Sequence, residues 1–420
     1  MILQRTPNLK GRRRVRGRQW LPAEGLSVKK DGSAAAPIYL DHAATTPVRP
    51  EVAAVMAERL TEDFGNPSSG HRWGRRARRR LDEARATLAA ALGVEAGSVC
   101  FTRGGTESDN LAVLGSVRGL DGVAARGGAH VVTSAVEHPA VAAAAGRAVE
   151  EGARHTVVGF VDGEFDLDGL RAALGDRDRP VVVSCMWVNN ETGLELPLAQ
   201  IAAECRIHDV RLHSDAVQAV GKIELSLEEV PVDLLTVTGH KIYGPKGTGA
   251  LIARSRRGIE PLHFGGGQEG GLRPGTEDVA GAAGLAEAVR LAVREAPAES
   301  HRLAALRDEA ESRLIDGIPG ARVNAGGMRR APHILSLAIP GIDSDTLLAA
   351  LDAEGIAASG GSACASGSSA PSASLAALYP GDTAASLRLS FGRLNDGEQV
   401  DRVAAVVSGA VDRIRTVWTS

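Results

Sequence analysis

Short runs of apolar and β-branched residues alternate with longer amphipathic runs between residues 37 and 265. This alternation is typical of a parallel sheet whose strands are joined by covering helices. The apolar runs predict strands at 98–102, 130–134, 156–161, 180–188, 210–214, 234–238 and 249–253. The amphipathic runs predict helices at 75–92, 107–117, 139–150 and 198–208. Residues 37–265 are therefore predicted to form a large, doubly wound α/β domain with a mainly parallel sheet.

The glycine-rich stretch 264–275 ends this rhythm. The sequence after it predicts helices at 279–294, 300–315 and 395–416, and strands at 333–339 and 386–391. We therefore predict a smaller α+β domain over residues 266–420. Whether the first residues of the large domain pack with this small domain is left open.

Composition and charge exclude several classes of partner. The chain has 420 residues, 44% of them hydrophobic, which is ample for a large core. A net charge of -3, from 48 basic and 51 acidic residues, gives no general attraction to nucleic acid or to an anionic membrane. No apolar run approaches the roughly 18 residues of a membrane span. Four scattered cysteines, without a zinc-type pattern, predict a reducing, cytoplasmic setting and no metal site.

Residues 1–36 differ from the rest of the chain, because nine Lys and Arg residues there face only Glu24 and Asp31. They show no apolar periodicity, so we predict a disordered, solvated tail. The alternatives are an arm that contacts nucleic acid or a partner, an amphipathic transit peptide, or upstream sequence attached by a misplaced start codon. We expect no signal peptide.

One lysine and one carboxylate are the strongest candidates for chemistry. Lys241 lies in the run Thr-Val-Thr-Gly-His-Lys-Ile-Tyr-Gly-Pro-Lys at 236–246, and Asp215 lies in His-Ser-Asp-Ala-Val-Gln at 213–218. Pyridoxal phosphate needs an amine to capture its aldehyde and a buried acid to keep its ring nitrogen protonated. Lys241 and Asp215 can supply these two groups. A lone lysine, however, is most often a solvated surface charge.

Phosphate candidates fall where predicted strands give way to helices, since helix N-termini favour anions. Gly104 and Gly105 permit a tight turn there, and Thr106 offers a hydroxyl next to the first free N–H groups. The same residues would also suit an ordinary helix cap. Thr238 and His240, just before Lys241, can add donors from a second direction.

Two further polar residues follow predicted strands. His138 should lie at the carboxyl edge of the sheet, where an imidazole can stack on a cofactor ring and move protons. The alternative is a helix cap or a surface residue. Asn190, in Asn-Asn-Glu-Thr-Gly at 189–193, can project into the same crevice, although this run is also good turn chemistry.

Taken together, motifs in nine places resemble those of the cysteine desulfurases, which are class V, fold-type I pyridoxal-phosphate enzymes. They are Tyr-Leu-Asp-His-Ala-Ala-Thr-Thr-Pro at 39–47, Gly-Asn-Pro-Ser-Ser at 65–69, Gly-Thr-Glu-Ser-Asp-Asn at 105–110, Glu-His at 137–138, Val-Asn-Asn-Glu-Thr-Gly at 188–193, Ser-Asp-Ala-Val-Gln at 214–218, Thr-Gly-His-Lys-Ile-Tyr-Gly-Pro-Lys-Gly at 238–247, Gly-Gly-Gly-Gln at 265–268 and Arg-Pro-Gly-Thr at 273–276. The resemblance covers nearly the whole chain after the tail. It implies the two-domain aminotransferase-like fold and a homodimer.

Cys364 distinguishes among the enzymes of that superfamily. Its surroundings at 358–369, Ala-Ser-Gly-Gly-Ser-Ala-Cys-Ala-Ser-Gly-Ser-Ser, offer no apolar face, so we predict a loop in which a thiol is available as a nucleophile. The loop resembles that of group I desulfurases. After it, however, Ser-Ala-Pro-Ser-Ala-Ser at 369–374 lacks the acidic residue and the His that group I members usually have. Docking of an acceptor or anchoring of the loop is therefore expected to differ.

The resemblance also implies a role for each site residue. Arg388 and Asn190 would hold the carboxylate of the substrate, L-cysteine, and Lys241 with His138 would move its α proton. Cys364 would attack the substrate sulfur, leaving alanine and a Cys364 persulfide for an acceptor. The cofactor would be held by Asp215 at the ring nitrogen, by Gln218 at the ring hydroxyl, and at the phosphate by Gly105, Thr106, Thr238, His240 and, from the second subunit, Thr276.

Two other functions stay open at this point. A related pyridoxal-phosphate enzyme, such as an aminotransferase or a selenocysteine lyase, would leave Cys364 incidental. A binding protein on an inactive enzyme fold would use the basic tail to reach nucleic acid. The sulfur acceptor is equally open, since an iron–sulfur scaffold, a tRNA-thiolation enzyme, a DNA-modification system and a cofactor pathway draw on the same chemistry.

Overall fold

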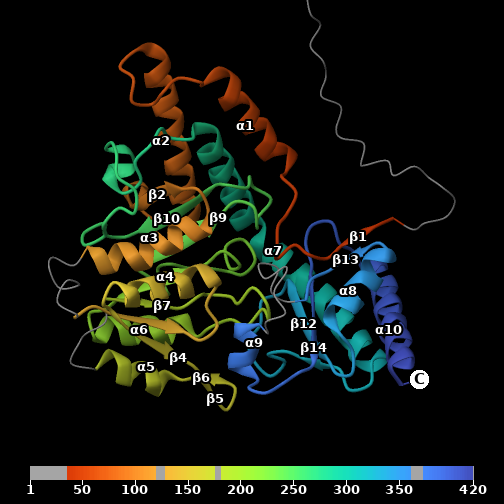
Figure 1. Cartoon of the computed structure of the whole chain (residues 1–420). Coiled ribbons are helices and arrows are strands. Elements are labelled where there is room, and N and C mark those ends of the chain that lie inside the picture. The colour runs from red at the N-terminus through yellow and green to blue at the C-terminus, as the bar shows by residue number, and fades with distance from the viewer. Residues whose placement is uncertain (1–35, 120–127, 176–180, 361–371, 420) are drawn as a thin grey trace, which may run out of the picture. The chain divides into compact units, whose positions relative to one another are not determined.

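The computed structural model describes residues 36–119, 128–175, 181–360 and 372–419. Predictions for the tail, apart from its last residue, and for Cys364 lie outside these residues. A seven-stranded sheet of order β2-β10-β9-β8-β7-β3-β4 forms the centre of the larger lobe (Figure 1). Its strands are β2 (Val99–Thr102), β3 (His130–Ser134), β4 (Arg154–Val158), β7 (Val182–Ser184), β8 (Arg211–Asp215), β9 (Leu234–Thr238) and β10 (Gly249–Ala253).

The pairing of these strands confirms the predicted fold class. The strands from β9 to β4 are parallel, and only β10 runs antiparallel to its neighbours. Every residue of β3, β9 and β10 is buried, as expected for strands covered on both faces. The predicted strand 156–161 is instead divided between β4 and β5 (Phe160–Val161), which pairs with β6 (Glu164–Phe165) as a small hairpin.

The larger lobe contains α1 and α5, two helices that the pattern did not predict. The helices of this lobe are α1 (Pro50–Glu62), α2 (Arg72–Leu92), α3 (Gly105–Arg118), α4 (Pro139–Glu150), α5 (Leu167–Leu174) and α6 (Leu198–Ile207), with a 3₁₀ turn η1 (Ala96–Ser98). Helix α1 buries only Val52 and α5 spans 8 residues. Such helices carry a weak periodic signal, and both were missed.

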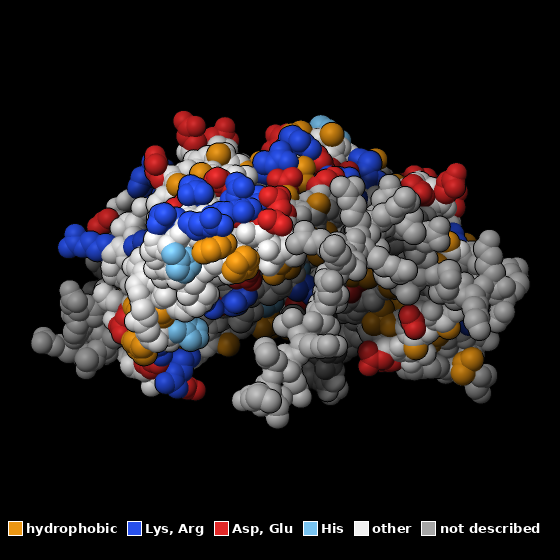
Figure 2. Space-filling model, turned by 90° about the horizontal axis from the view of Figure 1, so that it is seen from above, with side chains coloured by type: hydrophobic (Ala, Val, Ile, Leu, Met, Phe, Trp, Pro, Cys, Tyr) orange, Lys and Arg blue, Asp and Glu red, His pale blue; other side chains and the backbone are white. Residues whose placement is uncertain are grey.

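Helix α2 contributes to a basic face. Lys and Arg side chains gather on the face seen from above, interspersed with acidic ones (Figure 2). Several arginines of α2 pair with acids, as Arg78 does with Asp82 at 3.0 Å and Arg80 with Glu83 at 2.8 Å. The positive charge of this helix is therefore partly neutralised.

One helix joins two hydrophobic cores. Helix α7 (Val279–Gly317) is continuous over 39 residues, so the prediction of two separate helices was wrong. Pro297 lies inside it, and a proline costs an internal hydrogen bond. The helix continues because its first half packs in the core of the large sheet, whereas Leu303 and Leu314 pack in a second core.

The second core surrounds a small antiparallel sheet of order β11-β12-β14. Its elements are β11 (Arg322–Val323), β12 (Ile334–Ile339), α8 (Ser344–Ala353), β13 (Ile356–Ala357), α9 (Ala373–Leu378), β14 (Ala385–Ser390) and α10 (Gly397–Thr419). Strand β1 (Ile38–Tyr39) pairs in parallel with β13, and Ile38 and Leu40 belong to this core. The boundary at 265 and 266 stays a prediction. No helix among the described residues is long and apolar enough to cross a membrane.

Candidate functional site

The turn after β9 holds Lys241 against the segment 41–46. The Lys241 Nζ donates to the carbonyl oxygens of Ala43 and Ala44 at 2.7 and 2.6 Å. Thr46 fixes the turn, because its N–H and hydroxyl donate to the His240 carbonyl at 2.8 and 2.9 Å. The lysine amine is therefore half-buried and directed toward this segment.

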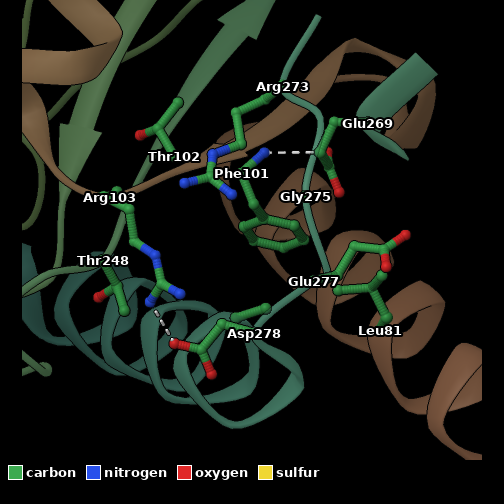
Figure 3. Close-up of a pocket in the computed structure, with 12 residues that line it drawn as sticks. Leu81, Phe101, Thr102, Arg103, Thr248, Glu269, Arg273, Gly275, Glu277 and Asp278 are labelled. Carbon is green, nitrogen blue, oxygen red and sulfur yellow. Dashed lines mark hydrogen bonds and ion pairs between the residues drawn. The ribbon is translucent and has the colours of Figure 1, made fainter. Parts of the chain in front are cut away.

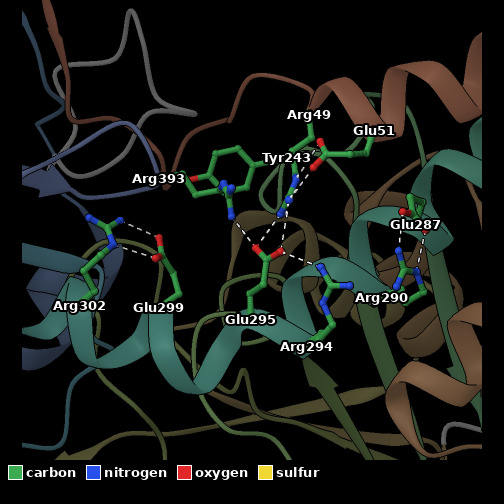
Figure 4. A network of polar contacts seen from close by, with 10 residues as sticks. All are labelled: Arg49, Glu51, Tyr243, Glu287, Arg290, Arg294, Glu295, Glu299, Arg302 and Arg393. Carbon is green, nitrogen blue, oxygen red and sulfur yellow. Dashed lines mark hydrogen bonds and ion pairs between the residues drawn. The ribbon is translucent and has the colours of Figure 1, made fainter.

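Tyr243 anchors the far side of that turn, with a left-handed φ of 63°. Its N–H donates to the Thr46 hydroxyl at 2.6 Å, and its own hydroxyl accepts from the Arg393 N–H at 2.7 Å. Arg49 and Arg393 both pair with Glu295 behind it (Figure 4). A residue in left-handed conformation needs such support, since that backbone is costly for a side chain larger than glycine.

Asp215 ends β8, at the carboxyl edge of the sheet, and is 5% exposed. Burial raises the pKa of this carboxyl, while the charges of His138 and Lys241 act in the opposite direction. His138 caps α4, and its Nδ1 accepts from the Ala140 N–H at 3.1 Å. The structure thus brings together the amine, the acid and the imidazole that the sequence singled out.

Gln218 shares an acceptor with Lys241. Its Nε2 donates to the Ala43 carbonyl at 2.8 Å, and its Oε1 lies 3.2 Å from His333 Nε2. Burial lowers the pKa of His333 far below its ordinary value, so the ring is neutral and donates from Nε2. Both ends of the Gln218 amide are therefore oriented.

Helix α3 begins with free N–H groups. Gly104 is its N-cap, with φ 140°, and no side chain caps this end. Gly105 opens the helix and Thr106 is exposed beside it, so an anion can bind here. The predicted second set of donors is less free. The Thr238 hydroxyl already donates to the Thr248 carbonyl at 2.9 Å, and His240 Nδ1 lies 3.2 Å from the Thr45 hydroxyl.

A hollow beside this turn is lined by Arg103 and Arg273 (Figure 3). Arg103 pairs with Asp278 at 2.8 Å, and Arg273 pairs with Glu107 at 3.0 Å. The second pair fastens the glycine-rich loop to the first turn of α3, and the first pair joins the N-cap of α7 to the residues before α3. Thr276, which the resemblance assigns to the second subunit's phosphate site, is exposed and directly follows that loop.

Arg388 contacts the backbone of Asn190, whereas the resemblance implied that both residues hold the substrate carboxylate. Arg388, 1% exposed in β14, donates from Nη1 to the Asn190 backbone carbonyl at 2.8 Å. Its Nη2 donates to Asp41 Oδ1 at 2.8 Å. The run 189–193 forms a turn in which Asn189 Oδ1 accepts from the Thr192 N–H at 2.8 Å. The turn interpretation therefore holds, and it places the Asn190 carbonyl against Arg388.

Sequence reasoning missed three buried titratable residues near Asp215. Asp109, Glu137 and His213 have side chains of low exposure behind the site. Glu137 accepts from the Met186 N–H at 2.8 Å, and burial raises its pKa to about 8. Their burial comes from the packing of α3 against β3 and β8, which has no local signature in the sequence.

Comparison with known proteins completes the description of the site. The family model Aminotransferase class-V matches residues 38–403. A cysteine desulfurase of Gluconacetobacter diazotrophicus is 42% identical over 385 residues, which cover 90% of this chain and 94% of that protein. The solved structure of a NifS-like protein matches with a TM-score of 0.81 at 30% identity and covers 90% of this chain and 99% of its own. SspA in complex with cysteine matches with a TM-score of 0.71 at 28% identity, covering 84% and 98%.

Proposed function

Because this chain belongs to the class V aminotransferase family, whose members depend on pyridoxal phosphate, we propose that it is a cysteine desulfurase acting on L-cysteine. The family and fold predicted from the motifs are thereby confirmed. One observation supports the proposal most strongly: the segment 41–44 accepts hydrogen bonds from both side chains. Lys241 donates to the carbonyls of Ala43 and Ala44, and Arg388 donates to the Asp41 carboxylate. One short segment thus contacts both the amine proposed to bind the cofactor and the guanidinium proposed to bind the substrate carboxylate.

The described residues fit the cofactor. The half-buried Lys241 amine would hold its aldehyde, and the buried Asp215 carboxylate would hold its ring nitrogen. The start of α3 at Gly105 and Thr106, which no side chain caps, would hold its phosphate. His138 and Gln218 would contact the ring, while Thr238, His240 and Thr276 of a second subunit would complete the phosphate site. When bound, the cofactor withdraws electrons from the substrate's Cα.

The residues of the chain divide the remaining tasks. Arg388 would bind the substrate carboxylate, because its planar fork suits two parallel hydrogen bonds, while Asp41 and the Asn190 carbonyl keep that fork oriented. The Lys241 Nζ, helped by His138, would take the α proton. Cys364 Sγ would attack the substrate sulfur. The S–S bond would form as the Cβ–S bond breaks, and the electron pair of the broken bond would stay with Cβ, which takes up a proton. Alanine would then leave, with the persulfide on Cys364.

Three further parts of the proposal concern the setting. The enzyme would act as a homodimer, since Thr276 would serve the second subunit's phosphate. The persulfide would pass to an acceptor, with iron–sulfur cluster assembly as one destination. The scattered cysteines favour a reducing, cytoplasmic compartment.

Replacement of the lysine tests this proposal. In Lys241→Ala, the visible absorbance of lysine-bound cofactor and the release of alanine from cysteine should both be lost. Lys246→Ala, at an exposed position five residues away, should retain both and serves as the matched control. Alanine release by Lys241→Ala at the wild-type rate would refute the assignment.

A further inference from the structure

Asp109 is a buried acid that pairs with no Lys or Arg among the residues that the structure describes. Its side chain lies in α3, is 1% exposed, and its Oδ1 accepts no hydrogen bond there. His213 Nε2 lies 3.7 Å from that oxygen, which is too long for a hydrogen bond. The proposed chemistry gives Asp109 no task, so its place beside the site needs a separate explanation.

The groups that face Asp109 come from three other segments. Asp215 and His213 lie on β8, Thr236 lies on β9, and Glu137 and His138 lie between β3 and α4. No Lys or Arg among the described residues pairs with Asp109. Burial raises the pKa of Asp109 well above its ordinary value, and the negative charge of Asp215 raises it further.

His213 is a neutral imidazole. Its Nδ1 lies 2.8 Å from the Ser184 hydroxyl and its Nε2 lies 3.0 Å from the Thr236 hydroxyl, and a neutral ring satisfies both contacts. Burial lowers the pKa of His213 to about 3. The imidazole therefore offers no positive charge to Asp109 near neutral pH.

Asp109 and Asp215 form an unequal pair. One carboxylate oxygen of Asp109, one carboxylate oxygen of Asp215 and one ring nitrogen of His138 all lie within 4.8 Å of one another. Two buried carboxyl groups this close do not both ionise readily, so one of them keeps its proton. The charges of His138 and Lys241 favour ionisation of Asp215. At Asp109 the negative charges of Asp215 and Glu137 oppose ionisation, and the Thr236 hydroxyl alone favours it. The proton therefore belongs on Asp109.

We propose that Asp109 is a positioning residue that stays protonated in the working enzyme, so that the single negative charge of the pair stays on Asp215, which would hold the ring nitrogen of the cofactor. This inference rests on the proposed function, because the ring nitrogen gives the charge on Asp215 its use. An ionised Asp109 would divide the negative charge between two positions and weaken its alignment with the ring.

Isosteric amides at the two positions test the assignment. Infrared absorption of protonated carboxyl groups is recorded near neutral pH on the wild-type holoenzyme, and on Asp109→Asn and Asp215→Asn at saturating pyridoxal phosphate. Cofactor affinity is measured in parallel by equilibrium dialysis. Asp109→Asn should lose part of the carboxyl absorption and keep cofactor affinity within about 3-fold, since an amide replaces a neutral acid without changing charge. Asp215→Asn should keep the absorption and lose at least about 10-fold in affinity.

Two results would overturn the inference. One is an unchanged carboxyl absorption in Asp109→Asn, and the other is a loss of cofactor affinity in Asp109→Asn as large as that in Asp215→Asn. Failure of the wild-type protein to bind pyridoxal phosphate would instead refute the proposed function, and the inference with it. The Glu137→Gln variant identifies the remaining absorption, because the pKa of Glu137 is also raised by burial.

Discussion

Arg388 Nη2 donates to Asp41 Oδ1 at 2.8 Å across 347 residues of sequence. The guanidinium is 1% exposed, so the carboxylate balances a charge that water scarcely reaches. The same contact joins β14 to the segment that receives Lys241. The proposed binding site for the substrate carboxylate is therefore oriented by a residue next to the lysine segment.

Removal of this ion pair should destabilise the fold. Asp41→Asn leaves the buried Arg388 charge without this carboxylate, and we expect the free energy of unfolding to fall by about 3 kcal/mol. Asp82→Asn, which breaks an exposed pair with Arg78, should cost less than about 1 kcal/mol. Urea unfolding of both variants measures the difference. Equal losses of unfolding free energy in the two variants would contradict the prediction that the buried pair of Asp41 and Arg388 contributes more than an exposed pair.

Arg388→Gln should act on substrate binding more than on cofactor binding. Loss of a charge-assisted contact is worth about 1.5–3 kcal/mol, so KM for cysteine should rise about 10- to 100-fold. The absorbance of bound cofactor should be unchanged. Steady-state kinetics with cysteine measure the effect, and an unchanged KM would remove Arg388 from the substrate site.

Gly249 supports the turn that starts α3. A Cβ at this position would come within 2.7 Å of the Gly104 carbonyl carbon and 2.8 Å of the Val237 oxygen. Gly249→Ala should therefore displace the turn, lower the free energy of unfolding by about 1–3 kcal/mol and weaken cofactor binding. Gly97→Ala, where a Cβ meets no atom within 4 Å, is the control. Equilibrium dialysis against pyridoxal phosphate measures the cofactor affinity of both variants, and equal affinities would contradict the prediction.

Glu137 should make stability fall with rising pH. Its pKa is 4.5 ordinarily and about 8 in the folded protein, because of burial. Between these values the unfolded chain loses the proton and the folded protein keeps it, so folding becomes less favourable as pH rises. Glu137→Gln removes this effect and should gain stability relative to wild type from about pH 5 to pH 8. Parallel unfolding curves for both proteins across this range would contradict the assignment, with exposed Glu83→Gln as control.

The sequence predicted the strands better than it predicted the helices. The bounds of β3, β9 and β10 match the predicted ones to the residue, because runs of buried apolar residues end at polar or glycine positions. Helix α7 was divided at Pro297, since a proline normally ends a helical pattern. Packing on two cores outweighs that local preference, and the sequence pattern does not contain this information.

The site residues that lie in short sequence motifs could be predicted. Lys241, Asp215, His138 and Gln218 each lie in a short run at a strand end, and the structure brings them together. The contact of Asp41 with Arg388 joins distant segments and has no local signature. The same holds for the burial of Asp109, which depends on β8 packing behind α3.

The central claim is that Cys364 receives the sulfur of L-cysteine, and one measurement tests it most directly. Purified enzyme is incubated with L-cysteine without reductant or acceptor, and alanine is quantified while peptide mass spectrometry locates the persulfide. Wild type and the Cys205→Ala control, altered at a buried thiol, should each form about one alanine and one Cys364 persulfide per site. Cys364→Ser should form neither. Alanine and sulfide production by Cys364→Ser at the wild-type rate would contradict the account.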